Sequence, residues 1–207
     1  MKIYNWQDGI NKYELVDVIT VLEEGGIVIF PTDTVYGIAC NCFQEEAIKK
    51  LYEIKNRPNY KPINVLTDNI SKIELITKNI NDKEKQLIDK YMPGALTLIM
   101  EKNDNIPNVL TAGLETIGVR IPNNKIALSI LEKFDYPLAV TSVNISGQKE
   151  GIAVEDFIDE FENKVDVIID GGKSEIGIPS TIIKVNEEKI ETIRQGTIKV
   201  EEELIWY

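Results

Sequence analysis

Side chains that could bind a substrate are concentrated in short polar segments that directly follow apolar runs. Residues 31–37 follow the apolar run 27–30 and offer two threonine hydroxyls and the carboxylate of Asp33. Open α/β sheets bind their ligands beyond the ends of strands, so these groups could hold an amino acid. The same residues could also form only a capped turn.

A second segment, residues 55–62, places the cations Lys55, Arg57 and Lys61 within seven residues at the end of an expected helix. Two prolines stiffen the segment, and fixed cations are what a triphosphate needs. The cations could instead only complement the negative end of the helix dipole. The sequence leaves both interpretations open.

Arg120 stands inside the apolar run 117–122. Burying a guanidinium is costly unless a carboxylate or phosphate meets it, and we expect a ligand-binding role rather than an internal ion pair. Residues 142–147 follow another apolar run, 138–141, with small hydroxyl and amide side chains. Such groups suit a nucleotide or its phosphates, although this segment could also be only a turn.

The chain contains no histidine, which excludes His-based zinc sites, Ser–His–Asp triads and histidine general bases. The two cysteines, Cys40 and Cys42, would share one face of a strand, too close for an easy disulfide and without a further thiol to complete a zinc site. We expect them to be buried and inert. Residues 170–174 do not form a P-loop, because Val167 stands where that motif needs glycine. A glycine turn is expected there.

Hydrophobic periodicity predicts the elements that must position these segments. Apolar residues at helical spacing predict helices around 15–22, 48–52, 82–91, 126–134 and 154–162. Short apolar runs predict strands at 27–30, 63–66, 96–100, 117–121, 138–141, 165–169, 181–185 and 190–194. The alternation predicts an α/β fold with an open, twisted, mixed parallel and antiparallel sheet flanked by helices, in a single domain spanning residues 1–207.

The composition limits the partners of the protein. The 207 residues carry a formal net charge of −11, which argues against a surface covered by nucleic acid but allows a local basic cleft. The first eight residues lack the pattern of a signal peptide, and no run of 18 apolar residues exists. We expect a cytoplasmic protein without membrane association.

Taken in order, seven segments resemble the YrdC-like threonylcarbamoyl-AMP synthase family: residues 31–37, 55–62, 93–97, 120–122, 142–147, 179–181 and 194–196. Each motif is weak alone, but their common order over most of the chain is specific. The resemblance implies an open twisted α/β sheet with a deep, locally positive cleft. The end of the chain soon after Arg194 suggests the single-domain bacterial type.

The resemblance also implies an activity. Family members condense L-threonine, bicarbonate or CO₂ and ATP to threonylcarbamoyl-AMP and pyrophosphate. A tRNA threonylcarbamoyl-transferase complex then moves the threonylcarbamoyl group to the adenosine beside the anticodon, so hand-over to that complex and a weak tRNA contact are implied. The substrates supply every reacting group, and the protein needs only to position and neutralise them. Mg²⁺ is expected with ATP, without a dedicated carboxylate site on the protein.

Carried over by position, the resemblance assigns roles to individual residues. Threonine would be held by Thr34, Arg120 and Ser180, with Thr141 or Val140 lining its pocket. ATP would be held by Lys55, Arg57, Lys61, Thr116, Ser142, Asn144 and Arg194, of which Lys55 and Arg57 are assigned to catalysis. Two positions depart from the pattern: Leu66 replaces a frequent histidine, so its contact with threonine is open, and Thr-Ser-Val-Asn at 141–144 replaces Pro-Ser-Ala-Asn.

Two alternatives compete with this assignment. The YrdC-like module of hydrogenase-maturation proteins performs a related carbamoyl-adenylate chemistry, but in large multidomain chains with zinc-finger-like cysteines. A pure RNA-binding module is the alternative from another class, and the acidic charge and the lack of interleaved aromatic and basic residues argue against it. Threonine-dependent release of pyrophosphate from ATP would distinguish an enzyme from a binding module.

Overall fold

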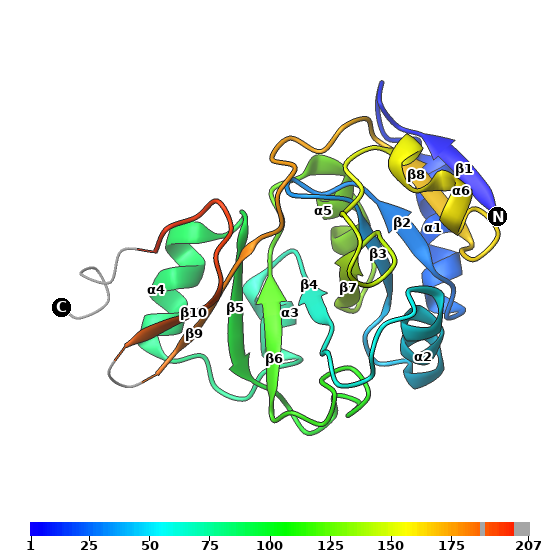
Figure 1. Ribbon diagram of the computed structural model, residues 1–207. Helices are drawn as coiled ribbons and strands as arrows, with labels where there is room; N and C mark the ends of the chain where they lie inside the picture. Colours follow the sequence, from blue (N-terminus) through cyan, green and yellow to red (C-terminus); the bar gives the residue numbers. More distant parts are fainter. Residues whose placement is uncertain (187–188, 201–207) are drawn as a thin grey trace.

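A sheet of ten strands runs through the computed structural model, which describes residues 1–186 and 189–200 (Figure 1). Its strand order is β1-β8-β2-β3-β7-β4-β6-β5-β9-β10. In chain order the strands are β1 (Lys2–Asn5), β2 (Val28–Phe30), β3 (Gly37–Asn41), β4 (Asn64–Leu66), β5 (Leu96–Glu101), β6 (Thr116–Arg120), β7 (Leu138–Ser142), β8 (Val167–Asp170), β9 (Thr181–Val185) and β10 (Ile190–Arg194).

The strand pairs are both parallel and antiparallel. Strand β8 is parallel to β1 and β2, β4 is parallel to β6, and β5 is parallel to β9. The pairs β2–β3, β3–β7, β4–β7, β5–β6 and β9–β10 are antiparallel. Figure 1 shows β1 at one end of the sheet and the β9–β10 hairpin at the other. The predicted open mixed sheet is confirmed.

Helices cover the sheet through two hydrophobic clusters. The helices are α1 (Lys12–Glu23), α2 (Glu45–Ile54), α3 (Ile70–Glu74), α4 (Asp82–Tyr91), α5 (Lys125–Lys133) and α6 (Ile158–Phe161), with the 3₁₀ turn η1 (Val154–Asp156). Helices α1 and α5 pack in the smaller cluster, whereas α2, α3, α4 and α6 pack in the larger one. Val28 and Phe30 of β2 belong to the smaller cluster and Ile29 to the larger, as the alternation of side chains along a strand requires.

The sequence did not predict β1, β3 or α3, and it predicted one helix over 154–162 where the structure has two short ones. Strand β3 is composed largely of small residues and follows a polar segment, so it lacks the usual signal of β-branched side chains. The helix is interrupted at Phe157 (φ −143°, ψ −7°), whose ring packs on Tyr36 with centroids 5.3 Å apart. Tertiary packing therefore overrides the helical pattern there.

The helices of the described residues are short, and the longest of them, α1, has 12 residues. Among the described residues, no helix combines the length and apolar character needed to cross a membrane.

The two cysteines lie where the sequence placed them. Cys40 and Cys42 are free, fully buried and part of the larger cluster. Burial raises the pKa of the Cys40 thiol to about 12 and that of Cys42 well above its usual range. The thiolate, which is the reactive form, is therefore suppressed at both positions.

We expect a thiol-specific disulfide reagent at pH 8 to label neither Cys40 nor Cys42 quickly in the native protein. Both thiols should react within the dead time after unfolding in guanidinium, because burial and the raised pKa are then lost. Absorbance of the released thiol provides the measurement. Fast labelling of one cysteine under native conditions would show that its environment is open to solvent.

Candidate active site

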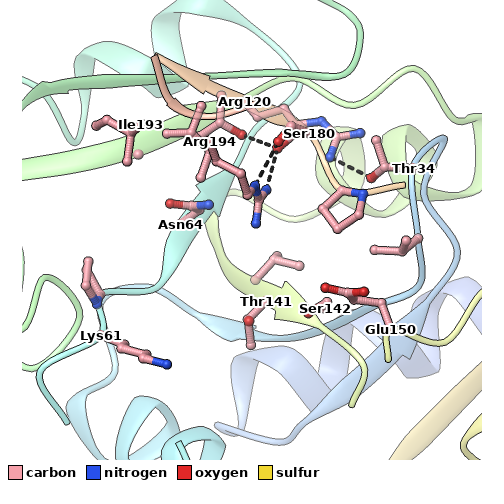
Figure 2. Close-up of a pocket in the computed structure, with 18 of the residues that line it drawn as sticks. Thr34, Lys61, Asn64, Arg120, Thr141, Ser142, Glu150, Ser180, Ile193 and Arg194 are labelled. Carbon is pink, nitrogen blue, oxygen red and sulfur yellow. Dashed lines mark hydrogen bonds between the residues drawn. The ribbon is translucent and has the colours of Figure 1, made fainter. Parts of the chain in front are cut away.

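A cavity of about 890 Å³ opens over strands β4, β5, β6, β9 and β10 and reaches the ends of β3 and β7 (Figure 2). From β6, Thr116, Gly118 and Arg120 line the cavity, whereas the intervening Ile117 and Val119 are buried in the larger cluster. One face of the strand thus builds the core and the other builds the cavity floor, because successive side chains point to opposite faces.

Asp33, a further candidate from the sequence, does not line this cavity, whereas all the residues to which the family resemblance assigned a role do so. They are Thr34, Lys55, Arg57, Lys61, Thr116, Arg120, Thr141, Ser142, Asn144, Ser180 and Arg194. Leu66 and Val140 also line it. The fold therefore brings together segments from the beginning, middle and end of the chain. Their separate roles in binding threonine or ATP stay predictions.

The cavity is positively charged although the protein is acidic. Among the described residues, six of its lining side chains are of cationic type, namely Lys55, Arg57, Lys61, Arg120, Lys184 and Arg194, and two are acidic, Glu150 and Glu191. The cationic side chains outnumber the acidic ones even though Asp33 offsets the charge of Arg120. The whole chain has a formal charge of −11. The local basic cleft that the sequence allowed is present, and it favours an anionic ligand.

Arg120 is held by three protein groups at the end of β6. Its Nε donates to Gly94 O at 2.8 Å, its Nη1 donates to Thr34 Oγ1 at 2.8 Å, and its Nη2 forms an ion pair with Asp33. The sequence favoured a ligand-binding role over an internal ion pair, and the structure shows that the ion pair is present. The ligand-binding role stays a prediction. A guanidinium has five N–H groups, and these contacts use three of them. Within the described residues, one N–H on Nη1 and one N–H on Nη2 have no hydrogen-bond acceptor and could bind a ligand.

Lys55 follows α2 and joins that helix to the loop after β7. Its ammonium donates to Ser142 O and, at 3.0 Å, to Asn144 Oδ1, which also accepts from Ser142 Oγ at 2.8 Å. Burial, and to a smaller extent the nearby positive charge of Arg57, together lower the pKa of Lys55 to about 7. A lysine with this pKa can change its charge when an anion binds beside it.

Arg57 stiffens the segment that carries it. Its Nε donates to Lys61 O at 3.0 Å and its Nη2 donates to Pro62 O at 2.7 Å. Tyr52 Oη also donates to Lys61 O at 2.8 Å. Figure 2 shows the side chain of Lys61 on the opposite side of the cavity from Thr34. The segment after α2 is thus a loop that its own side-chain hydrogen bonds hold in place. Its cations do more than interact with the helix dipole.

The last strand contributes a third arginine. Arg194 donates from Nε to Ser180 O at 3.0 Å and from Nη2 to Ser180 Oγ at 3.2 Å. Ser180 Oγ also shares a hydrogen bond of 2.7 Å with Thr97 Oγ1 of β5. Figure 2 places Ser180 between Arg194 and Arg120. Hydrogen bonds therefore connect Ser180 to Arg194 and to Thr97.

Sequence reasoning missed several residues of the cavity, among them Asn64, Gly118 and Glu150. A Cβ at position 118 would lie 2.2 Å from Asn64 Oδ1 and 3.2 Å from Ile99 Cδ1. A glycine inside an apolar strand is a sign of such close approach and could have indicated this position. Nothing in the sequence near Glu150 indicates its place beside the cavity.

A family model described as Telomere recombination, covering the Sua5, YciO and YrdC proteins, matches residues 20–196. A relative from Methanocaldococcus jannaschii is 39% identical over 97% of this chain and 94% of its own length. This chain belongs to the Sua5–YciO–YrdC family.

Two longer family members share this unit. The threonylcarbamoyl-AMP synthase of Bacillus subtilis is 35% identical over 93% of this chain and 56% of its own length. The crystal structure of Pyrococcus abyssi Sua5 complexed with L-threonine superposes with a TM-score of 0.92 at 34% identity, over 95% of this chain and 58% of that one. The chain therefore spans little more than half the length of these two relatives.

Gly118 allows a sharp test of the cavity floor in this member of the family. We expect Gly118→Ala to lower the free energy of unfolding by about 1–3 kcal/mol, because the added methyl overlaps Asn64. The double variant Asn64→Ala/Gly118→Ala should recover most of that loss, since the overlapping amide is removed. Urea denaturation of both variants measures the effect. A double variant no more stable than Gly118→Ala would assign the loss to another cause.

Lys55 should make anion binding depend on pH. Below pH 7 its ammonium is already charged, whereas above its pKa of about 7 the free protein must take up a proton to present a cation. We expect the affinity for inorganic tripolyphosphate to fall by up to about tenfold per pH unit above 7, relative to Lys55→Met. Calorimetry of both proteins in two buffers of different ionisation enthalpy measures the affinity and the proton uptake. Equal pH slopes would contradict a titrating role for Lys55.

Proposed function

We propose that this protein makes threonylcarbamoyl-AMP from L-threonine, bicarbonate or CO₂ and ATP, releasing pyrophosphate. The observation that carries the proposal is one cavity that combines a buried arginine and two hydroxyls with several further cations. Arg120, Thr34 and Ser180 suit the carboxylate and polar groups of an amino acid. Lys55, Arg57, Lys61 and Arg194 suit a triphosphate.

The relatives support the same reaction. The Bacillus subtilis and Pyrococcus abyssi proteins are named threonylcarbamoyl-AMP synthases, and the Pyrococcus structure contains L-threonine. Because these proteins are longer than this chain, the activity of the chain by itself is part of the proposal. Its role in tRNA modification and hand-over of the product to a transferase complex follow from the same likeness.

The proposed chemistry uses groups that the substrates supply. The threonine ammonium loses a proton to solvent and its nitrogen adds to the carbon of CO₂. A second proton then leaves to solvent, which gives the carbamate. A carbamate oxygen then attacks the α-phosphorus of ATP, the bond to the bridging oxygen breaks, and pyrophosphate leaves with that electron pair. Arg120 would fix the threonine carboxylate, while Lys55, Arg57 and Arg194 would neutralise the phosphates and hold the two anions in line.

Mg²⁺ would enter bound to the phosphates of ATP. Among the described residues, no three Asp, Glu, Cys or His side chains gather as a metal site. The cavity supplies the carboxylates Glu150 and Glu191, and Mg²⁺ commonly combines one or two carboxylates with substrate phosphates and water. The residues present fit a metal carried in by the nucleotide.

The decisive experiment is mass spectrometry of the product formed from ATP, L-threonine and bicarbonate, together with a pyrophosphate assay. We expect threonylcarbamoyl-AMP to form and pyrophosphate release to require threonine. Release that is independent of threonine, or binding of ATP without turnover, would reject the proposed function.

The amino-acid pocket predicts a specific defect for Arg120→Lys. Lysine cannot present two parallel N–H groups to a carboxylate, and the loss of a charged hydrogen bond should raise the threonine KM about 10- to 150-fold. The KM for ATP should change little. Steady-state pyrophosphate release measures both constants, with circular dichroism as the control for folding.

Substrate choice tests the same pocket in the wild-type enzyme. Valine should be used far less than threonine, and serine should lose about 10- to 200-fold in kcat/KM. A threonine KM unchanged in Arg120→Lys, or equal use of valine, would show that threonine is not held here.

A further inference from the structure

Four groups beside Arg120 form a hydrogen-bond chain that fixes where each hydroxyl proton lies. Thr32 Oγ1 lies 2.7 Å from Val35 O, 3.0 Å from Thr34 Oγ1 and 3.2 Å from Thr34 N. Arg120 Nη1 lies 2.8 Å from Thr34 Oγ1. Thr32 and Thr34 are both buried, with exposed fractions of 3% and 1%, and both line the cavity.

The donors and acceptors in this chain can be assigned completely. A carbonyl oxygen can only accept a hydrogen bond, so the Thr32 hydroxyl donates its single proton to Val35 O. Thr32 Oγ1 then accepts from Thr34 N and from the Thr34 hydroxyl, which fills both of its lone pairs. Thr34 has thereby donated its proton, and Arg120 fills one of its lone pairs. A single lone pair on Thr34 Oγ1 remains for a ligand.

We propose that Thr32 is a positioning residue that fixes the polarity of Thr34, so that Thr34 presents only an acceptor to the amino-acid substrate. This inference rests on the proposed function and deepens it. The group that meets Thr34 must be an N–H or O–H donor, which is the α-amine or the β-hydroxyl of threonine. The substrate carboxylate, an acceptor, belongs instead on the free N–H groups of Arg120.

An acceptor at this place suits the proposed reaction at each stage. When the threonine amine adds to CO₂, the nitrogen gives up protons but keeps one N–H in the carbamate. The β-hydroxyl is unchanged throughout. Either donor can therefore keep its hydrogen bond to Thr34 from substrate to product. A Thr34 hydroxyl that was free to rotate could instead point its proton at the substrate donor and repel it.

Thr32→Val keeps the shape of the side chain and removes its hydroxyl. The Thr34 proton then loses its acceptor, and we expect the dissociation constant for L-threonine to rise about 5- to 150-fold, the range for one buried donor left unpaired. Thr32→Ser keeps the hydroxyl and loses the methyl, so it should bind threonine nearly as the wild type does. A packing role predicts the reverse order of the two variants.

A double-mutant cycle with Thr34→Val distinguishes two effects of Thr32→Val on threonine affinity. One acts through the Thr34 hydroxyl, and the other is general damage to the loop. Thr32→Val leaves Val35 O and Thr34 N without their partner in either background, so that loss cancels. If Thr32 acts through the Thr34 hydroxyl, Thr32→Val should change threonine affinity less than about twofold in the Thr34→Val background. Should Thr32→Val unfold, Thr32→Ala in the same cycle makes the same comparison.

Isothermal titration of L-threonine and L-valine into the four proteins reads out the cycle, with ATP affinity as the control. Loss of affinity for threonine alone identifies the β-hydroxyl as the donor, and equal loss for both amino acids identifies the amine. Additive effects of the two substitutions, or a Thr32→Ser defect as large as that of Thr32→Val, would overturn the inference. Failure of the wild type to bind threonine would instead reject the proposed function, and this inference with it.

Discussion

The buried ion pair between Arg120 and Asp33 connects parts of the fold that the sheet keeps apart. Asp33 follows β2 and Arg120 ends β6, and three strands, β3, β7 and β4, separate these two in the sheet. Asp33 Oδ1 also accepts from Asn123 N at 3.1 Å, ahead of α5, and Arg120 binds Gly94 O, ahead of β5. Removing one partner of such a pair typically costs about 3–5 kcal/mol, because it leaves a buried charge uncompensated. The pair therefore sets the geometry on which the proposed amino-acid end of the cavity depends.

The cations of the cavity lie close enough for each to disfavour the charged form of its neighbours. Arg57 lowers the pKa of Lys55 and of Arg194, and Arg194 lowers that of Arg120, in each case after the larger effect of burial. Backbone carbonyls of Ser142, Lys61, Pro62 and Ser180 hold these side chains in place. The protein thus holds several positive charges close together, and an anionic ligand would reduce their mutual repulsion.

The sequence predicted most of the elements but not all of them, and the reasons are local. Strands β5, β6 and β7 contain enough apolar residues to be predicted from the sequence. Strand β3 consists mostly of small residues and becomes a strand by pairing with β2 and β7. In the cavity, the predicted residues are those with charged or hydroxyl side chains near turns. Gly118 and Asn64 were not predicted because they matter through their close contact, which forms only when the sheet is packed.

The sequence by itself determined the kind of chemistry available. The lack of histidine, the cations after α2, Arg120 in an apolar strand and the ordered family motifs pointed to binding of anions without a protein nucleophile. Tertiary structure decided how these groups are used. It paired Arg120 with Asp33, lowered the pKa of Lys55 to about 7 by burial, and gave Thr34 a single free lone pair. These properties depend on distance and desolvation between residues far apart in the chain, and neither quantity is encoded in the spacing of residues along it.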